Sequence, residues 1–223
     1  MILETNNVVV FDLDDTLYNE VDFLKSAFNS ISLKISAQIQ GNKTAICNDM
    51  LDFYLAKENV FELILKKYQC TYNINQLLNF YRTHKPELFL KQENIEILDY
   101  LKQKEMSLGL LTDGRSIQQR SKIKAMNLEG YFTEIIISEE FGSEKPNIKN
   151  YKYFEKTFKE GEYFYIGDNL KKDFITPNKL GWTTICLLDN GFNIHSQDFN
   201  LSQEYLPKHK INTLKEIKNI IQL

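Results

Sequence analysis

Short apolar runs that end in polar residues alternate with helical patterns along most of this chain. The runs are rich in β-branched or aromatic residues, which is typical of strands covered on both faces of a parallel sheet. They occupy residues 8–13, 107–113, 133–138, 162–168 and 182–188. Apolar residues at helical spacing predict helices between them, at residues 94–104, 116–126, 148–158 and 170–180. This alternation predicts an α/β fold with a parallel sheet and right-handed crossovers.

Residues 18–85 interrupt the alternation, because they show helical spacing and no clear strand. Apolar residues recur at Val21, Leu24, Phe28 and Ile31, and again at Phe53, Val60, Ile64 and Tyr68. Pro86 restricts the residue before it, so the chain can leave the helical segment there. We therefore predict a Rossmann-like core formed by residues 1–17 and 86–223, with a small α-helical domain inserted at 18–85.

The last predicted helix contains a proline. Pro177 lies inside residues 170–180, where it would split or kink a helix. Gly181 follows this segment and favours the left-handed conformation that ends many helices. We expect the helix to stop there, immediately before the last apolar run.

Charge and cysteine content narrow the class of partner and the compartment. A formal net charge of −3 favours a small-molecule partner, because nucleic-acid-binding proteins usually carry concentrated basic surface. Residues 1–7 lack the basic end and apolar run of a signal peptide, and no apolar stretch is long enough to span a membrane. Cys47, Cys70 and Cys186 are odd in number and far apart. These features predict a cytoplasmic protein with reduced thiols and no membrane partner.

Polar and acidic side chains follow several of the predicted strands. The first run ends in Asp12, Asp14 and Asp15, the second in Thr112 and Asp113, and the fourth in Asp168. Ligands of open parallel sheets gather beyond the carboxyl ends of the strands, so these groups should share one edge. Carboxylates brought together repel one another unless a cation or a shared proton offsets them. A hard divalent ion with oxygen ligands, most simply Mg²⁺, meets that need.

Asp12 and Asp14 are two residues apart, so their side chains lie on the same side of an extended segment. One of them can attack a substrate while the other transfers protons. Lys145 follows the third run, where its ammonium group would keep a nucleophilic carboxylate ionised and help to neutralise a phosphoryl group. Together these residues favour phosphoryl-transfer chemistry.

Four short motifs occur in order along the chain. They are "DLDDT" at residues 12–16, Thr112 in "LLTDG", Lys145 in "EKP", and "GDNLKKD" at residues 167–173. In these motifs the sequence resembles the haloacid dehalogenase superfamily of hydrolases, whose patterns are DxDx[TV], a strand-ending Thr or Ser, a Lys, and GDxxxxD. The resemblance covers nearly the whole predicted core, from about Val8 to Leu188.

The resemblance implies a catalytic role for four of the matched residues. Asp12 would be the nucleophile that accepts the phosphoryl group as an aspartyl phosphate. Asp14 would protonate the leaving oxygen and then deprotonate the hydrolytic water. Thr112 would hydrogen-bond a phosphoryl oxygen, and Lys145 would pair with Asp12 and with the phosphoryl group.

The resemblance also implies a metal site. Mg²⁺ would bind the carboxylates of Asp12 and Asp168 and the backbone carbonyl of Asp14, and would shield the incoming anion from these acids. For Asp173 two roles stay open: contact with the metal through water, or orientation of Lys145.

The inserted helical segment has the position of this family's cap, between the first and second motifs. Such caps close over small substrates, exclude water and supply specificity contacts. Residues 17–23 would form the hinge and flap, where Tyr18, Asn19 and Glu20 can meet the substrate. The resemblance therefore implies a small phosphorylated metabolite as the partner.

Other polar residues near the motifs have simpler interpretations. Asp15 fits a structural role in the turn. Asp113 either belongs to the turn after Thr112 or lines the substrate site with it, and Gly114 would allow the backbone to approach an anion closely. The remaining candidates fit ordinary surface or packing positions: His84, Arg115, Lys171, Lys172, His195 and His209.

These observations predict Mg²⁺-dependent hydrolysis of a small phosphomonoester through an aspartyl phosphate. Asp14 argues against a dehalogenase, which needs no acid two residues after its nucleophile. A sugar phosphomutase would use the same four motifs, and a non-catalytic phosphometabolite-binding or regulatory protein could share the same core. Release of inorganic phosphate would separate the hydrolase from both alternatives.

Overall fold

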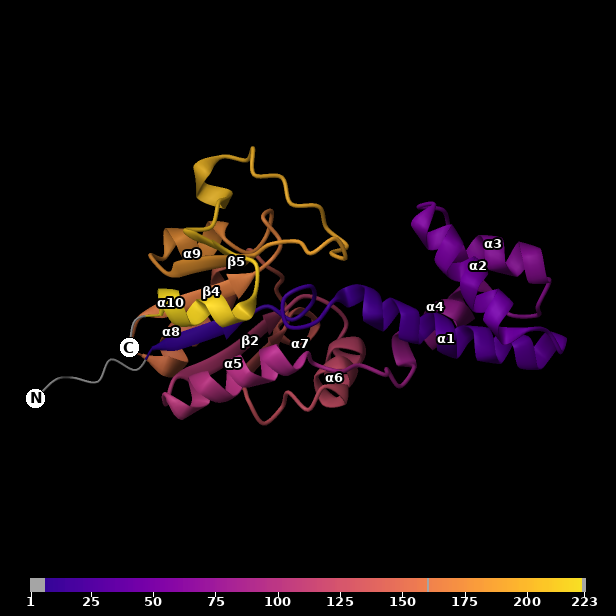
Figure 1. Ribbon diagram of the computed structural model, residues 1–223, viewed down its shortest axis with the longest axis horizontal. Coiled ribbons are helices and arrows are strands. Elements are labelled where there is room, and N and C mark those ends of the chain that lie inside the picture. Colours follow the sequence, from indigo (N-terminus) through magenta and orange to yellow (C-terminus); the bar gives the residue numbers. More distant parts are fainter. Residues whose placement is uncertain (1–6, 160, 222–223) are drawn as a thin grey trace, which may run out of the picture. The chain divides into compact units, whose positions relative to one another are not determined.

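The structure is a computed structural model that describes residues 7–159 and 161–221. The chain divides into two compact units. One unit contains the chain up to Glu20 and from Phe89 onward, and the other contains Val21–Leu88 (Figure 1). The domain boundaries predicted after residues 17 and 85 each lie three residues before the observed ones.

The first unit is built on a six-stranded parallel sheet with the strand order β3-β2-β1-β4-β5-β6. The strands are β1 Val8–Phe11, β2 Ser107–Thr112, β3 Glu134–Ile137, β4 Tyr163–Gly167, β5 Thr183–Leu187 and β6 His209–Ile211. The first five match the five predicted runs, which confirms the predicted α/β fold. The sequence analysis missed β6, because this short edge strand exposes two of its three residues and lacks an apolar run.

Strand β1 lies next to the point where the strand order reverses. Val8 of β1 pairs with Ser107 of β2 on one side and with Tyr163 of β4 on the other. The chain then runs outward from β1 to β3 in one direction and from β4 to β6 in the other. Ligand sites of open parallel sheets lie beyond the carboxyl ends of the strands at such a reversal. Asp12, after β1, and Asp168, after β4, flank this point.

The helices of the first unit connect these strands. They are α5 Gln92–Gln103, α6 Ser116–Ala125, α7 Ser138–Phe141, α8 Ile148–Phe158, α9 Ile175–Lys179 and α10 Ile217–Ile220, with 3-10 turns η1 Gln203–Tyr205 and η2 Leu214–Glu216. Three of the four predicted helices are confirmed as α5, α6 and α8. The structure therefore has the crossover helices that a parallel sheet requires.

The fourth predicted helix, 170–180, was too long. Only Ile175–Lys179 is helical, and residues 170–174 form turns and bends. Pro177 neither splits nor kinks the helix, because it lies in the first turn, where a backbone N–H has no partner within the helix. Gly181 does adopt the expected left-handed conformation, with φ 83°.

Both faces of β1 are covered, which explains its unbroken apolar sequence. Val8 and Val10 pack in one cluster with Tyr151 and Phe154 of α8. Phe11, which points to the opposite face, contacts the ring of Phe132 with centroids 6.2 Å apart. Burial of each such side chain stabilises the fold by about 1.5–3 kcal/mol. The strand that carries the site is thus a rigid part of the core.

The second unit consists of helices, as predicted. They are α1 Glu20–Ile39, α2 Lys43–Leu55, α3 Val60–Tyr68 and α4 Ile74–Thr83. Asparagines at 42, 59 and 73 cap α2, α3 and α4 by accepting a backbone N–H three residues later. The pattern from Phe53 to Tyr68 is therefore not one helix, because the Asn59 cap starts a new helix after the turn that ends α2. None of the described helices is long and apolar enough to cross a membrane.

Candidate active site

Asp12 directly follows β1 and is held by its neighbours. Its backbone N–H donates to Ile166 O of β4 at 2.8 Å, and its side chain is 8% exposed. Lys145 Nζ lies 2.8 Å from Asp12 Oδ1. Burial raises the pKa of Asp12 to about 7, although the Lys145 ammonium opposes that shift. A buried carboxylate beside one cation, at the end of a central strand, is a suitable nucleophile.

Lys145 is shared between two carboxylates. Its Nζ lies 2.7 Å from Asp173 Oδ1, in addition to its contact with Asp12. Burial alone would lower the pKa of Lys145, but Asp12 and Asp173 raise it well above its usual value. Lys145 therefore stays charged.

Asp173 is fully buried and both of its oxygens accept hydrogen bonds. Oδ1 pairs with Lys145, while Oδ2 accepts the backbone N–H groups of Asp168 at 3.1 Å and Asn169 at 2.8 Å. A Cβ at Gly167 would overlap this carboxylate, so glycine is required beside it. Of the two roles left open by the sequence, these contacts favour orientation of Lys145 and of the loop after β4.

Asp14 lies in the turn after β1 and has a separate set of partners. Lys122 Nζ of α6 lies 2.8 Å from Oδ1 and 3.0 Å from Oδ2. Tyr18 donates its hydroxyl to Oδ1 at 2.5 Å, and Gln119 donates Nε2 to Oδ2 at 2.9 Å. Burial would raise the pKa of Asp14, but Lys122, Tyr18 and Gln119 together lower it below its usual value. The structure therefore holds Asp14 as a carboxylate.

Asp168 follows β4 and completes a cluster of acids. One carboxylate oxygen from each of Asp12, Asp168 and Asp173 lies within 4.8 Å of the others. Burial, followed by the charges of Asp173 and Asp12, raises the pKa of Asp168 to about 9. A divalent cation would offset this repulsion, and the oxygen donors suit a hard ion such as Mg²⁺. The residues present thus fit the metal that the sequence implies.

The loop after β5 supports the Asp168 side of the site. Asn193 Nδ2 donates to Asp168 Oδ2 at 2.9 Å, and Gln197 Nε2 donates to the Asp168 backbone carbonyl at 2.9 Å. Ile194 donates its N–H to Asp15 Oδ2 at 2.8 Å. Asp15, with φ 55°, also accepts the N–H of Glu20 at 2.8 Å. Asp15 therefore ties the turn after β1 to this loop, as its structural interpretation requires.

Thr112 ends β2 and is 1% exposed, with Gln119 Nε2 2.6 Å from its hydroxyl oxygen. Asp113 turns its carboxylate toward two lysines: Oδ1 accepts the Lys145 backbone N–H at 3.0 Å, and Oδ2 accepts Lys172 Nζ at 3.1 Å. Gly114 follows with φ 140°, a conformation that favours glycine.

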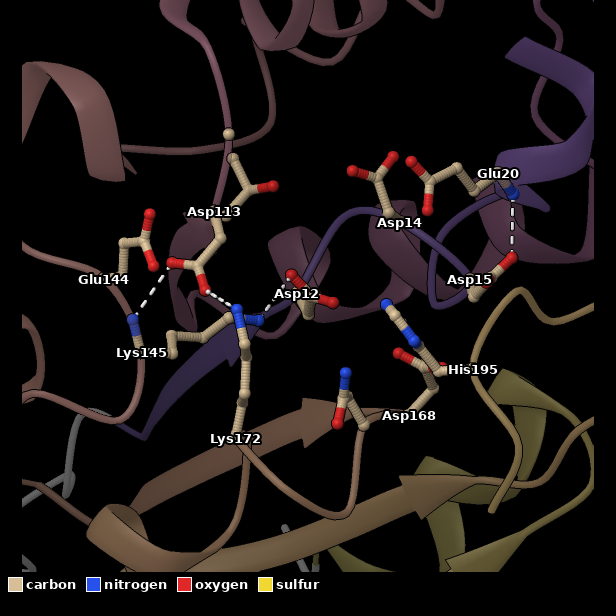
Figure 2. A pocket seen from close by; sticks show the side chains of 13 residues that line it. Asp12, Asp14, Asp15, Glu20, Asp113, Glu144, Lys145, Asp168, Lys172 and His195 are labelled. Carbon is tan, nitrogen blue, oxygen red and sulfur yellow. Dashed lines mark hydrogen bonds and ion pairs between the residues drawn. The ribbon is translucent and has the colours of Figure 1, made fainter. Parts of the chain in front are cut away.

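These groups surround a pocket of about 310 Å³ in the first unit. Figure 2 shows Lys145 and Lys172 beside Asp113 and Glu144 on one side of Asp12, with Asp14, Asp15 and Glu20 on the other side. The lining residues are Asp12, Asp14, Asp15, Glu20, Thr112, Asp113, Gly114, Glu144, Lys145, Asp168, Asn169, Lys172 and His195. The structure thus brings Asp12, Asp14, Thr112, Lys145 and Asp168 together around one space.

Two pocket residues differ from the surface positions that the sequence predicts for them. Lys172 is not on a solvated helix face, because its segment is a turn and its ammonium group pairs with Asp113 at the pocket. His195 lines the pocket from the loop after β5. Glu20, expected in the flap, also lines it, and burial followed by the charge of Asp14 raises the pKa of Glu20 to about 8.

Sequence reasoning missed Gln119, Lys122 and Asn193. A signal for the first two exists: Gln119 lies four residues before buried Ile123, and Lys122 four residues before buried Met126. Polar residues in register with the buried face of a helix that follows a motif indicate a site contact. Asn193 lies in an irregular loop, where the sequence carries no comparable periodic signal.

Comparisons with known proteins agree with this geometry. The sequence pattern of the family described as haloacid dehalogenase-like hydrolase matches residues 9–187. The glyceraldehyde 3-phosphate phosphatase of Methanocaldococcus jannaschii is 28% identical over 225 residues, covering 96% of each chain. That of Pyrococcus furiosus is 28% identical over 191 residues, covering 80% of this chain and 79% of the relative.

A solved structure shows the same fold. The putative HAD-hydrolase YfnB of Bacillus subtilis, solved bound to magnesium, superposes with a TM-score of 0.67 at 20% identity, covering 99% of this chain and 100% of that one. The family match covers all four motifs and runs from β1 to β5 of the sheet that carries the pocket, and it confirms the predicted hydrolase class. The chain belongs to the haloacid dehalogenase-like hydrolases.

Proposed function

We propose that this protein hydrolyses a small phosphomonoester by transferring its phosphoryl group to Asp12. The observation that carries the proposal is the placement of two carboxylates at one pocket with different partners. Asp12 pairs with Lys145, whereas Asp14 pairs with Lys122. Two acids in different environments can take different roles, one as the nucleophile and the other as the proton carrier.

The proposed reaction has two displacements. Asp12 attacks phosphorus, the bond from phosphorus to the ester oxygen breaks, and Asp14 passes to the leaving alcohol a proton that it has first taken up from solvent. Water then attacks the aspartyl phosphate, its proton passes to Asp14, and the bond between phosphorus and Asp12 oxygen breaks. Inorganic phosphate leaves and both aspartates return to their starting states.

The other pocket residues bind and orient the phosphoryl group. Lys145 offers a charged donor next to Asp12, and the buried hydroxyl of Thr112 offers a neutral one. Mg²⁺ would be held by the carboxylates of Asp12 and Asp168 and by the backbone carbonyl of Asp14. Asp173 would orient Lys145 next to this site. When bound, Mg²⁺ supplies positive charge that offsets the acids and the phosphate dianion.

Glyceraldehyde 3-phosphate is the first substrate to test, because two relatives that match most of the chain are named glyceraldehyde 3-phosphate phosphatase. The pocket volume of about 310 Å³ suits a small metabolite. We further propose that the helical unit Val21–Leu88 acts as a cap that supplies specificity contacts. A cytoplasmic location remains part of this proposal.

Phosphate release with Mg²⁺ present tests the proposal directly. Glyceraldehyde 3-phosphate should be compared with other sugar phosphates, nucleotides and phosphoacids. The wild-type protein should release inorganic phosphate, and Asp12→Asn should release none while keeping the native circular dichroism spectrum. Asp99→Asn changes an exposed aspartate of α5 and is the matched control. Isomerised sugar phosphate without phosphate release would instead indicate a phosphomutase, and tight binding without turnover would indicate a binding protein.

A further inference from the structure

Helix α6 carries two polar side chains that are buried almost completely. Gln119 and Lys122 are each 2% exposed and lie three residues apart on the helix. Lysine and glutamine are seldom buried to this degree unless specific partners compensate the loss of water. Their partners belong to the pocket, on the turn after β1 and at the end of β2.

Lys122 holds both oxygens of one carboxylate. Its Nζ lies 2.8 Å from Asp14 Oδ1 and 3.0 Å from Asp14 Oδ2, and 3.8 Å from Glu20 Oε1. The Tyr18 hydroxyl adds a contact to Oδ1. An aspartate side chain can otherwise rotate about its own single bonds. Contacts to both carboxylate oxygens restrict that rotation in Asp14.

Gln119 connects Asp14 with the phosphoryl-binding residue. Its Nε2 lies 2.6 Å from Thr112 Oγ1, 2.9 Å from Asp14 Oδ2 and 3.1 Å from the Asp113 carbonyl oxygen. A carboxylate and a carbonyl can only accept, so the amide must present its NH₂ group here. The two hydrogens of this group face three acceptors, so one hydrogen is shared. Because the amide nitrogen cannot accept, the Thr112 hydroxyl keeps its own hydrogen to donate to a phosphoryl oxygen.

We propose that Gln119 and Lys122 are positioning residues that hold the Asp14 carboxylate and the Thr112 hydroxyl in fixed relation at the pocket. This inference rests on the proposed function, because it assigns these residues a purpose in phosphoryl transfer. After the first proton transfer Asp14 is a carboxylate that must face the attacking water. The contacts of Lys122 with both oxygens fix the orientation of that carboxylate.

The test uses Lys122→Met and Gln119→Met, which keep approximate length and remove the donor. With glyceraldehyde 3-phosphate both variants should lose about 10- to 100-fold in kcat, because Asp14 is misplaced for both proton transfers. Gln119→Met should also raise KM, since Thr112 loses its orienting donor. Lys124→Met, at an exposed position of the same helix, and Gln118→Met, at a half-buried one, should match the wild-type protein.

Changing the leaving group separates positioning from a general structural defect. Nitrophenolate leaves p-nitrophenyl phosphate without a proton, so the first displacement should stay within about threefold of wild type in Lys122→Met. The second displacement should slow, giving a burst of one nitrophenolate per chain before a slow steady rate. Equal slowing of burst and steady rate would overturn the inference, as would kinetics identical to those of Lys124→Met.

A double-variant cycle tests whether Lys122 acts through Asp14. In an Asp14→Asn background, Lys122→Met should change the residual rate by less than about twofold. A full additional 10- to 100-fold loss would contradict the inference. If Lys122→Met fails to fold, judged by circular dichroism, the same cycle with Gln119→Met decides, read in kcat alone because KM also reports the contact with Thr112.

A wild-type protein that releases no phosphate from any phosphomonoester would instead overturn the proposed function, and the inference with it. A wild-type protein that is active while both Met variants match their controls would overturn the inference alone. The two failures are therefore distinguishable.

Discussion

The Lys145 ammonium nitrogen lies 2.8 Å from Asp12 Oδ1, with both side chains more than nine-tenths buried. Asp173 holds the other side of the same ammonium group at 2.7 Å. Burial strengthens electrostatic repulsion and attraction alike. The two carboxylates are therefore stable beside each other only while the Lys145 ammonium group lies between them.

Lys145→Met should remove both activity and stability. Asp12 and Asp173 would lose their shared cation while staying buried, and loss of one partner from a buried ion pair typically costs about 3–5 kcal/mol. We expect a decrease of that size in the free energy of unfolding, measured by urea titration. Lys149→Met, at an exposed position of α8, should change it by less than about 0.5 kcal/mol. A Lys145→Met protein as stable as this control would show that the pair adds nothing to the fold.

Gly167→Ala should disturb the site through Asp173. The added Cβ would overlap the Asp173 carboxylate, which is fixed by Lys145 and by two backbone N–H groups. Overpacking of this kind costs about 1–3 kcal/mol, and displacement of Lys145 should lower kcat at least tenfold. Gly130→Ala is the control, because a Cβ at Gly130 meets nothing within 4 Å. Thermal unfolding and phosphate release measure both effects, and full activity in Gly167→Ala would contradict the role given to Asp173.

Asn193→Leu should weaken the metal site without removing a ligand. Asn193 donates to Asp168 Oδ2, and loss of a residue that orients a metal ligand typically reduces metal affinity 10- to 100-fold. Titration calorimetry with Mg²⁺ should show this weaker binding, and more Mg²⁺ should be needed for half-maximal activity. Asn200→Leu, at an exposed position of the next segment, should bind Mg²⁺ like the wild-type protein. Chelation should stop turnover in every variant, and unchanged rates in excess chelator would contradict the metal site.

His84 should make the protein less stable in acid. The residue is 7% exposed, and its ring places Nδ1 2.9 Å from the Tyr81 carbonyl oxygen and Nε2 3.1 Å from Ser26 Oγ. Burial lowers the pKa of His84, so the unfolded chain binds its proton more readily than the folded chain does. The free energy of unfolding should therefore fall as the pH drops below about 6.5, the usual histidine pKa.

A matched pair of variants isolates this contribution of His84 to the pH dependence. His84→Gln should lose less stability than the wild-type protein between pH 7.5 and pH 5.5, as measured by urea unfolding at each pH. His209→Gln replaces an exposed histidine and should follow the wild-type curve. Identical slopes for His84→Gln and the wild-type protein would exclude His84 as a source of acid sensitivity.

The strands that carry the site could be predicted because a strand buried on both faces has an unbroken run of apolar residues. Val8–Phe11 is apolar throughout because both faces of β1 are covered, so the run itself marks the strand. Strand β6 has no such signal, because two of its three residues are exposed. The segment before α9 was misassigned because side-chain contacts of Asp173, rather than helical spacing, determine its turns.

The charged centre of the pocket could also be anticipated, since its residues occur in ordered motifs at strand ends. The cationic partner of Asp14 could not, because Lys122 lies 108 residues away in sequence. Helical spacing places Lys122 on the buried face of α6, but only the folded chain shows which carboxylate it meets. Asn193 likewise reaches Asp168 from an irregular loop across 25 residues of sequence.

The most direct test of this account is to detect the phosphoryl group on Asp12. Asp14→Asn should be mixed with Mg²⁺ and p-nitrophenyl phosphate, quenched in acid at successive times, digested, and examined by mass spectrometry. Without its base, this variant should accumulate one phosphoryl group on the peptide that contains Asp12, at the rate at which nitrophenolate appears. Release of nitrophenolate and phosphate at equal rates, with no phosphorylated peptide at any time, would contradict Asp12 as the nucleophile.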